Sequence, residues 1–230
     1  MKQGKLYGVG VGPGDPELMT QKAVRIIQES DVIAVPKGGT GEQTALNIAA
    51  DLIREKPVLH CEMPMTRDQK VLDTCHEQAA DIICAQLDVG KNVAFLTIGD
   101  PAIYSTYWYV HRRVAARGYG VEIVPGIPSF CAAAARLGQA LCEGSQMLHI
   151  IPTSHTSTRE GLALPGNKIL MKAGRSILEV RDLLEADGKL DNAALVERCS
   201  MEGERVVRNL RDLEDPTGYF SVILVREGQG

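Results

Sequence analysis

The chain has 230 residues, of which 44% are hydrophobic and 23% charged, as in ordinary globular proteins. It carries 25 basic and 29 acidic residues, and the resulting net charge of −4 argues against a nucleic-acid-binding protein. No apolar run approaches the roughly 20 residues of a membrane-spanning helix. The first residues lead directly into a strand-like segment, without the apolar core of a signal peptide. We therefore expect a cytoplasmic protein with no membrane or nucleic-acid partner.

The first part of the sequence alternates short apolar runs with segments of helical periodicity. Between residues 17 and 30, for example, apolar side chains fall on one helical face. Gly90 and Gly118 mark the ends of two later helical segments. The pattern predicts strands at 5–11, 32–35, 92–98 and 121–124, and helices at 17–30, 42–54, 68–87 and 106–117.

The later part of the sequence contains more strands and fewer helices. Ser129 is in position to cap an alanine-rich helix over residues 130–141. Further strands are expected at 146–151, 168–171, 193–197 and 219–226, with a helix at 176–186. We place a boundary between two lobes within residues 118–130, with 125–128 as the hinge, and take 1–120 and 121–230 as two α/β domains.

Two glycine-rich turns each follow an apolar run. The first is Gly-Val-Gly-Val-Gly-Pro-Gly-Asp at residues 8–15, and the second contains Gly-Asp-Pro-Ala-Ile-Tyr-Ser-Thr at residues 99–106. Both stand where a strand is expected to end and a helix to begin, which is the edge of an open α/β sheet where ligands bind. The two turns predict one cleft for a small polar cofactor and a substrate.

These turns do not match the known phosphate-binding patterns. A dinucleotide-binding turn needs G-x-G-x-x-G, but the sixth position is Pro13 when counted from Gly8 and Asp15 when counted from Gly10. The Lys-Ser/Thr pair of a P-loop is also absent. A phosphate site is therefore disfavoured, and two ordinary tight turns remain the structural alternative.

The cysteines and histidines do not indicate a metal site. The six cysteines have no C-x-x-C spacing, which is typical of reduced thiols in a cytosolic protein. Cys75 and His76 are adjacent on a predicted helix, so their side chains point about 100° apart and do not readily share one ion. His155 lies in a polar loop that fits either a cleft lining or a plain surface loop.

An aromatic cluster follows the second glycine-rich turn. Trp108 stands among Tyr104, Tyr107 and Tyr109 in a chain that is only 4% aromatic. Such a cluster fits either stacking on a flat ligand or packing in the core or in a dimer interface.

Three motifs occur together in a fixed order: Gly-x-Gly-x-Gly-Pro-Gly-Asp, then Gly-Asp-Pro, then Val-Pro-Gly-Ile after the next strand. This combination resembles the tetrapyrrole methyltransferases, the class III S-adenosylmethionine-dependent family. The Tyr-Ser-Thr run and the following Tyr-Trp-Tyr-Val look like the branch that methylates C20 in cobalamin biosynthesis. The resemblance is strong over residues 5–40 and 92–136 and weaker over 140–230.

The resemblance implies two α/β domains with mixed sheets, an inter-domain cleft that binds S-adenosyl-L-methionine, and a homodimer. It implies methylation of C20 of an acidic tetrapyrrole, either precorrin-2 or cobalt-factor II, and the sequence does not distinguish the two. The cofactor-binding positions carried over from the family are Pro13, Ile98, Gly99, Asp100, Ile103, Ser129 and Met171.

The chemistry explains why no metal or nucleophile is expected. A sulfonium methyl is already activated, so the protein needs only to align the acceptor carbon and exclude water. Asp100 and Tyr104 are the candidates for removing the C20 proton, although a turn-forming role fits Asp100 better. Because the implied substrate is rich in carboxylates, cations at strand ends are expected to bind it, namely Lys37, Lys172 and Arg175.

Other functions stay open at this stage. Members of the same family act at other tetrapyrrole positions, and the Tyr-Ser-Thr run is a short discriminator. A nicotinamide-dependent oxidoreductase is disfavoured by the failed glycine motif and by Pro36-Lys37, where such enzymes have an acidic residue. A non-catalytic ligand carrier on the same fold is a third alternative.

Overall fold

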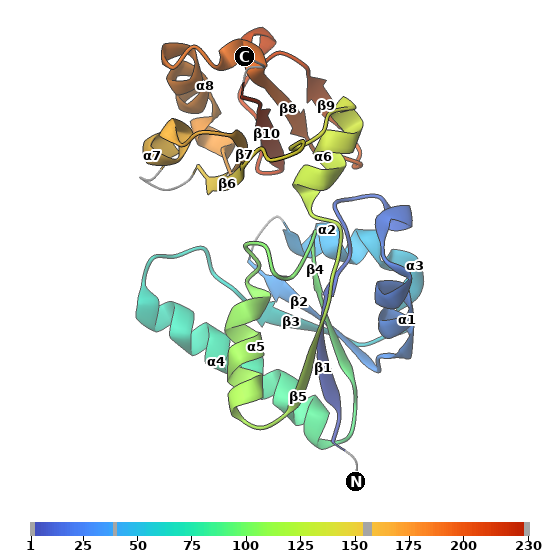
Figure 1. The fold of residues 1–230 in the computed structure, drawn as a ribbon. Coiled ribbons are helices and arrows are strands. Elements are labelled where there is room, and N and C mark those ends of the chain that lie inside the picture. Colours follow the sequence, from blue (N-terminus) through green and yellow to red (C-terminus); the bar gives the residue numbers. More distant parts are fainter. Residues whose placement is uncertain (1–2, 39–40, 154–157, 228–230) are drawn as a thin grey trace. The chain divides into compact units, whose positions relative to one another are not determined.

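The computed structural model describes residues 3–38, 41–153 and 158–227. It divides the chain into two units, Met1–Pro128 and Ser129–Gly230 (Figure 1). Each unit contains a five-stranded sheet with helices packed on it. The expected α/β class, with a sheet in each of two units, is confirmed.

The first unit has a sheet of strand order β3-β2-β4-β1-β5. All four strand pairs are parallel, so the expectation of a mixed sheet was wrong for this unit. Parallel pairing follows from the helical crossover between each pair of successive strands. Its elements are β1 (Lys5–Gly10), η1 (Pro16–Leu18), α1 (Gln21–Glu29), β2 (Val32–Lys37), α2 (Gly41–Ile48), α3 (Ala50–Ile53), β3 (Val58–Glu62), α4 (Gln69–Asp88), β4 (Val93–Thr97), α5 (Tyr107–Ala116) and β5 (Gly120–Val124).

The helices of this unit cover both faces of its sheet (Figure 1). Side chains alternate between faces along a strand. Val93 and Phe95 of β4 accordingly pack in one cluster with α4 and α5, while Ala94 and Leu96 pack in a second cluster with α1 and α2. Because both faces are buried at the centre of the sheet, the inner strands β2 and β4 are largely apolar, which made them easy to predict.

Two expected helices of the first unit differ in extent. The helix expected from residue 17 begins only at Gln21, because Thr20 has an extended backbone and its hydroxyl accepts a hydrogen bond from the amide of Ala23. Residues 16–18 form a separate 3-10 turn. The helix expected over 42–54 is divided into α2 and α3 at Ala49.

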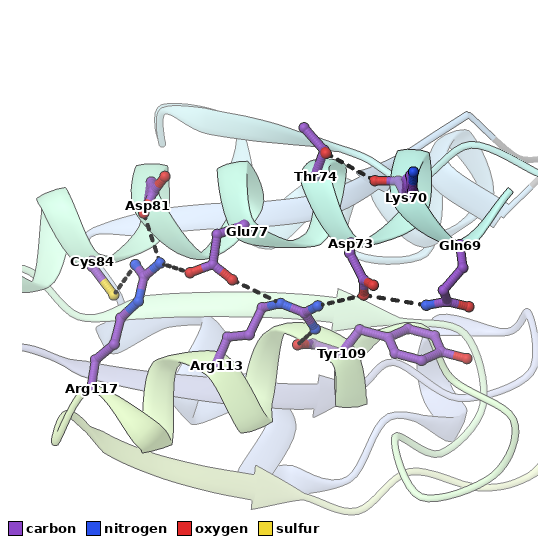
Figure 2. Close-up of polar contacts among 10 residues, drawn as sticks. All are labelled: Gln69, Lys70, Asp73, Thr74, Glu77, Asp81, Cys84, Tyr109, Arg113 and Arg117. Atoms are coloured by element: carbon purple, nitrogen blue, oxygen red, sulfur yellow. Dashed lines mark hydrogen bonds and ion pairs between the residues drawn. The ribbon is translucent and has the colours of Figure 1, made fainter.

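Helices α4 and α5 lie side by side and are joined by ionic contacts (Figure 2). Arg113 of α5 contacts Asp73 at 2.9 Å and Glu77 at 3.0 Å. One turn further on, Arg117 contacts the Glu77 carboxylate and, at 2.8 Å, Asp81. Because α5 directly follows the second glycine-rich turn, these ion pairs between α4 and α5 help to fix the position of that turn.

The second unit has a mixed sheet of order β6-β7-β10-β8-β9. Only β6 and β7 pair in parallel, and the other three pairs are antiparallel. Its elements are α6 (Ser129–Leu137), β6 (Leu148–Pro152), α7 (Thr158–Ala163), β7 (Asn167–Met171), η2 (Gly174–Ser176), α8 (Ile177–Ala186), η3 (Leu190–Asn192), β8 (Ala193–Glu197), β9 (Arg205–Val207), η4 (Leu210–Asp212) and β10 (Ser221–Val225).

The core of the second unit forms between its sheet and α8. Leu195 and Ile223 of the sheet pack in one buried cluster with Ile177 and Leu184 of that helix. Helix α6 contacts β8 and β10. It begins at Ser129 itself and ends at Leu137 rather than at residue 141, because Gly138 adopts a left-handed backbone with φ 69°.

One α-helix and two strands were not predicted from the sequence, namely α7, β3 and β9. Strand β3 lies at the edge of its sheet and buries only Cys61, so it lacks the apolar run of the inner strands. Helix α7 has six residues and β9 has three, too few for a clear periodic pattern. Among the described residues, no helix has both the length and the apolar character needed to cross a membrane.

Candidate functional site

The two glycine-rich turns lie at a point where the first sheet changes the direction of its crossovers. Strands β1 and β4 are neighbours, but α1, which follows β1, and α5, which follows β4, pack on opposite faces of the sheet. The loops that leave these two strands therefore diverge. In open α/β sheets such a point is where ligands bind.

The two turns are joined through their backbones. The amide of Gly99 donates to the carbonyl of Gly12 at 2.8 Å, and the amide of Gly12 donates to the carbonyl of Gly99 at 3.4 Å. Both residues have positive φ, 78° at Gly12 and 70° at Gly99, which glycine adopts without steric cost. The Gly-Asp-Pro turn is thus hydrogen-bonded to the first turn in a small antiparallel bridge.

The Val-Pro-Gly-Ile segment joins the same place. A Cβ atom on Gly126 would lie 2.1 Å from the carbonyl oxygen of Gly99, and one on Gly10 would lie 2.5 Å from that same oxygen. Both contacts are to backbone atoms, which cannot rotate away. We call Gly10, Gly12, Gly99 and Gly126 the glycine junction. It brings the three motifs of the sequence into direct contact.

Asp100 holds the glycine junction together with its side chain. One carboxylate oxygen accepts the amide of Ala102 at 2.7 Å, and the other accepts the amide of Gly126 at 2.9 Å. Its carbonyl oxygen accepts the amide of Ile103 at 3.2 Å. Both carboxylate oxygens are therefore engaged with backbone donors, as in a turn-forming carboxylate.

Tyr104 is the most unusual residue of the second turn. Its φ of 51° lies in the left-handed region, which for a non-glycine residue costs of order 1–3 kcal/mol. Its side chain is 45% exposed. Partial burial raises the pKa of its hydroxyl above the ordinary value of 10, so the phenol is protonated near neutral pH and is suited to donating a hydrogen bond.

The aromatic cluster beyond this turn separates into different environments. Tyr107 is fully buried against Phe95, and its hydroxyl lies 3.0 Å from Nδ1 of His111. Tyr109 stacks on His76 of α4, with ring centroids 4.4 Å apart. Trp108 packs beside His111. Of the four residues, Tyr107 belongs to the core and Tyr109 to the contact between α4 and α5.

The other predicted cofactor positions lie in both units. Pro13, Ile98 and Ile103 lie in the loops after β1 and β4, where Pro13 is buried and the two isoleucines are half-buried. In the second unit, Ser129 is the first residue of α6 and Met171 is the last residue of β7. The carbonyl of Met171 accepts hydrogen bonds from both the amide and the hydroxyl of Thr153.

The predicted cations differ in their surroundings. Lys37 ends β2, and its ammonium lies 2.6 Å from the carboxylate of Glu62. Lys172 follows β7 with a φ of 62°, and burial lowers its pKa. The backbone of Arg175 lies in the 3-10 turn after Lys172, but its side chain lies outside the described part of the chain. His155 also lies outside the described residues.

A second loop carries strained residues that the sequence did not reveal. Arg198 and Ser200, directly after β8, have φ values of 53° and 60°. The Glu204 carboxylate accepts the amide of Ser200 at 2.8 Å and also contacts Arg136. Nε of Arg198 donates to the carbonyl of Glu202 at 2.7 Å. A left-handed arginine or serine has no signature in sequence, so only the coordinates identify this loop.

The glycine junction is a closely packed piece of backbone that carries one carboxylate. Its groups are backbone amides and carbonyls and the carboxylate of Asp100, and the missing Cβ atoms let other backbone approach closely. A carboxylate within the turn disfavours bound phosphate. Within the ranges that the structure describes, no three His, Cys, Asp or Glu residues are arranged to hold a metal ion. All six cysteines are free.

Comparisons with known proteins agree with the two-sheet α/β fold. The family model of Tetrapyrrole (Corrin/Porphyrin) Methylases matches residues 5–214. Cobalamin biosynthesis protein CobIJ of Mycobacterium tuberculosis is 37% identical over 239 residues, covering 99% of this chain and 47% of that protein. The chain thus spans about half the length of the first curated relatives that it matches.

Two further relatives match along nearly their whole length. Cobalt-precorrin-2 C(20)-methyltransferase of Salmonella typhimurium is 33% identical, with 97% of each chain covered. Precorrin-2 C(20)-methyltransferase of a Sinorhizobium species is 31% identical, with 96% of this chain and 95% of that protein covered.

Solved structures share the fold at lower identity. A cobalt precorrin-4 methyltransferase has a TM-score of 0.78 at 22% identity, with 96% of this chain and 94% of that one covered. A uroporphyrin-III C-methyltransferase of Thermus thermophilus, complexed with S-adenosyl homocysteine, has a TM-score of 0.73 at 20% identity, with 97% and 98% covered.

Proposed function

The chain belongs to the tetrapyrrole (corrin/porphyrin) methylases, and from this premise we propose that it transfers the methyl group of S-adenosylmethionine to C20 of precorrin-2 or of its cobalt-containing counterpart. The observation that carries the proposal is the similarity, over nearly the whole of both chains, to two proteins named as C20-methyltransferases. Family membership also removes the support for a nicotinamide-dependent oxidoreductase.

S-adenosylmethionine supplies, when bound, a sulfonium methyl group whose thioether leaves without protonation. The task of this chain is then to hold the cofactor, align C20 with the methyl carbon and exclude water. The glycine junction supports the first task, because it fixes the backbone of the loops after β1 and β4, in which Pro13, Gly99 and Asp100 lie. The cofactor contacts proposed here are Pro13, Ile98, Gly99, Asp100, Ile103, Ser129 and Met171.

Neither candidate base has the properties that proton removal requires. Both oxygens of Asp100 already accept backbone amides. The Tyr104 phenol is protonated near neutral pH at its ordinary pKa of 10, and burial raises that pKa further, so it is a poor base. We infer that Asp100 acts as a positioning residue. The C20 proton then passes to a substrate carboxylate, or to solvent once the methylated product has left the site.

Carboxylates of the tetrapyrrole are proposed to meet cations at strand ends. Lys172 is the better supported candidate, because its strained backbone and partial burial are unusual for a surface lysine. Lys37 already contacts Glu62, so binding a substrate carboxylate requires exchange of that partner. Arg175, two residues after Ala173 in the chain, remains a candidate from its sequence position. A homodimer in the cytoplasm is the proposed assembly and location.

The test is an anaerobic methyl-transfer assay with S-adenosylmethionine labelled in the methyl group. Precorrin-2 and cobalt-factor II are offered separately, because identities of 31% and 33% to the two kinds of relative favour neither. Label on C20, located by NMR of the product, is the expected result. Label on another carbon assigns a different position within the family. Absence of transfer to either substrate, with S-adenosylhomocysteine still bound, contradicts the proposal.

A further inference from the structure

Tyr104 is the one non-glycine residue of the first unit, within the described ranges, whose φ is positive. It stands in the loop between β4 and α5, shortly before the chain enters the helix at Tyr107. At two nearby positions with a left-handed backbone, 12 and 99, the residue is glycine. A tyrosine in this conformation is strained, and such residues persist where the surroundings determine the backbone.

The bonds that impose this conformation come from the neighbours of Tyr104. The hydroxyl of Ser105 lies 2.8 Å from the hydroxyl of Thr97 and accepts the amide of Tyr107 at 3.2 Å. Tyr107 is itself fully buried. Its ring packs against Gly8 so closely that a Cβ atom on Gly8 would lie 2.1 Å from Cε1 of the ring. On the other side, Asp100 closes the turn that includes Ile103.

The hydrogen bonds just described are made by Ser105, Tyr107 and Asp100, and not by the ring of Tyr104. Glycine adopts the same φ without strain, and it does so at the neighbouring turns of this sheet. The ring of Tyr104 is 45% exposed, so a ligand at this loop can reach it, and a strained backbone of this kind often marks a functional position. The loop stands at the crossover point of the sheet, where a ligand is expected.

We propose that Tyr104 is a specificity-determining residue whose ring packs on the tetrapyrrole and sets its position at the loop after β4. This inference rests on the proposed function for the class of ligand, a flat conjugated macrocycle. Aromatic rings pack on such surfaces through offset stacking. The strained backbone aims the ring, and the Thr97–Ser105 pair maintains the strain.

The experiment measures tetrapyrrole affinity separately from turnover. Cobalt-factor II is titrated against the full chain by absorbance, with S-adenosylhomocysteine present, for the wild type, Tyr104→Gly and Tyr104→Phe. We expect Tyr104→Gly to weaken affinity for the tetrapyrrole at least tenfold, and Tyr104→Phe to stay within threefold of the wild type. Urea unfolding and S-adenosylhomocysteine affinity are measured on the same samples. These two measurements establish that each variant is folded and binds S-adenosylhomocysteine before tetrapyrrole affinities are compared.

Tyr109→Ala is the matched control, because Tyr109 is 46% exposed and lies five residues further on, but stacks on His76 in regular helix. It is expected to lower the unfolding midpoint and to leave tetrapyrrole affinity within threefold. The inference is overturned if Tyr104→Gly binds the tetrapyrrole as the wild type does, or if Tyr104→Phe loses as much affinity as Tyr104→Gly.

The outcomes also separate this inference from the proposed function. A wild type that binds cobalt-factor II but methylates neither it nor precorrin-2 contradicts the proposed function, while the variants still decide the role of Tyr104. A wild type that methylates C20 with no effect of Tyr104→Gly contradicts only this inference. A wild type that binds neither cobalt-factor II nor precorrin-2 overturns both.

Discussion

The loops that leave the two sheets reach left-handed backbone conformations with different residues. In the first unit, the left-handed positions just after β1, β2 and β4 are Gly12, Gly38 and Gly99. In the second unit, the residues just after β7 and β8 are Lys172 and Arg198. Each such non-glycine residue costs roughly 1–2 kcal/mol in this conformation.

This difference separates two ways of building a binding edge. At the glycine junction the backbone itself packs closely, so side chains are excluded by the carbonyl of Gly99. We call the edge of the second sheet from which the loops after β7 and β8 leave the second edge. There, residues with side chains adopt the left-handed conformation despite the strain, and the Glu204 carboxylate holds the loop after β8 by accepting the amide of Ser200. A backbone-built edge suits contacts to a small ligand, whereas a side-chain-built edge suits recognition of charged groups.

The largest effect is expected from adding one methyl group to the glycine junction. In Gly126→Ala the new Cβ falls 2.1 Å from a backbone oxygen, and no flexible side chain can move away. We expect a loss of about 3 kcal/mol in the free energy of unfolding, at the upper end for overpacking, together with loss of S-adenosylhomocysteine binding. Urea denaturation and calorimetry measure the two effects.

Gly118→Ala is the control for this substitution. Gly118 has a φ of 85°, but nothing lies within 4 Å of the position that a Cβ would take there, so only backbone strain is added. It is expected to lose about 1–2 kcal/mol and to bind the cofactor normally. Equal cofactor affinity in Gly126→Ala and Gly118→Ala contradicts the role given to the junction.

The next largest effect is expected at Asp100, which joins the Gly-Asp-Pro turn to Gly126. Asp100→Ala leaves the amides of Ala102 and Gly126 without their acceptor, at a cost of about 1–3 kcal/mol for each amide that stays buried and unpaired. We expect lower stability and weaker cofactor binding together. Asp100→Asn keeps one acceptor oxygen and sets its NH2 group against the other amide, so it is expected to lose part of the same stability and cofactor affinity. If Asp100 were the general base, Asp100→Asn would instead remove turnover almost completely, far beyond its losses of stability and cofactor affinity. Measuring all three quantities on both variants decides between these roles.

A smaller, pH-dependent effect is expected at the second edge. The hydrogen bond from the amide of Ser200, followed by that from Arg136, lowers the pKa of Glu204 below its ordinary 4.5. Because the folded-state pKa is the lower one, Glu204 stabilises the fold above about pH 4.5 and loses this contribution as the pH falls further. Glu204→Gln is expected to cost about 1 kcal/mol at pH 7.

The same substitution tests the origin of the pH dependence. The stability difference between the wild type and Glu204→Gln, from urea unfolding at pH 7, 5, 4 and 3.5, is expected to shrink at the two lowest values. A difference that stays constant over this range shows that Glu204 is not the titrating group.

The sequence predicts the glycine junction better than the second edge for a physical reason. Gly12 and Gly99 stand out because glycine is the residue that adopts positive φ without strain, and both follow apolar runs. Pro13, Ile98 and Ile103 therefore lie in the loops where they were expected, although their contacts with a cofactor stay predictions.

Features that depend on pairing between distant segments were not predictable. Lys37 was expected to bind substrate, but its contact with Glu62 arises because β2 pairs with β3, and β3 lacks an apolar run. Arg198 and Ser200 carry no local mark of their strained backbone. The parallel order of the first sheet follows from its crossovers rather than from any strand alone.

The smallest effect is expected from relieving strain at the second edge. Ser200 has a φ of 60°, and the bond that its amide donates to Glu204 does not need the side chain. Ser200→Gly removes roughly 1–2 kcal/mol of strain but adds about 0.5–1 kcal/mol of chain entropy to the unfolded state. A net gain of about 0.5 kcal/mol in the free energy of unfolding is therefore expected, measured by urea denaturation. A loss of stability would mean that the Ser200 hydroxyl stabilises the loop, so that the second edge, like the first, depends on the residue type that occupies it.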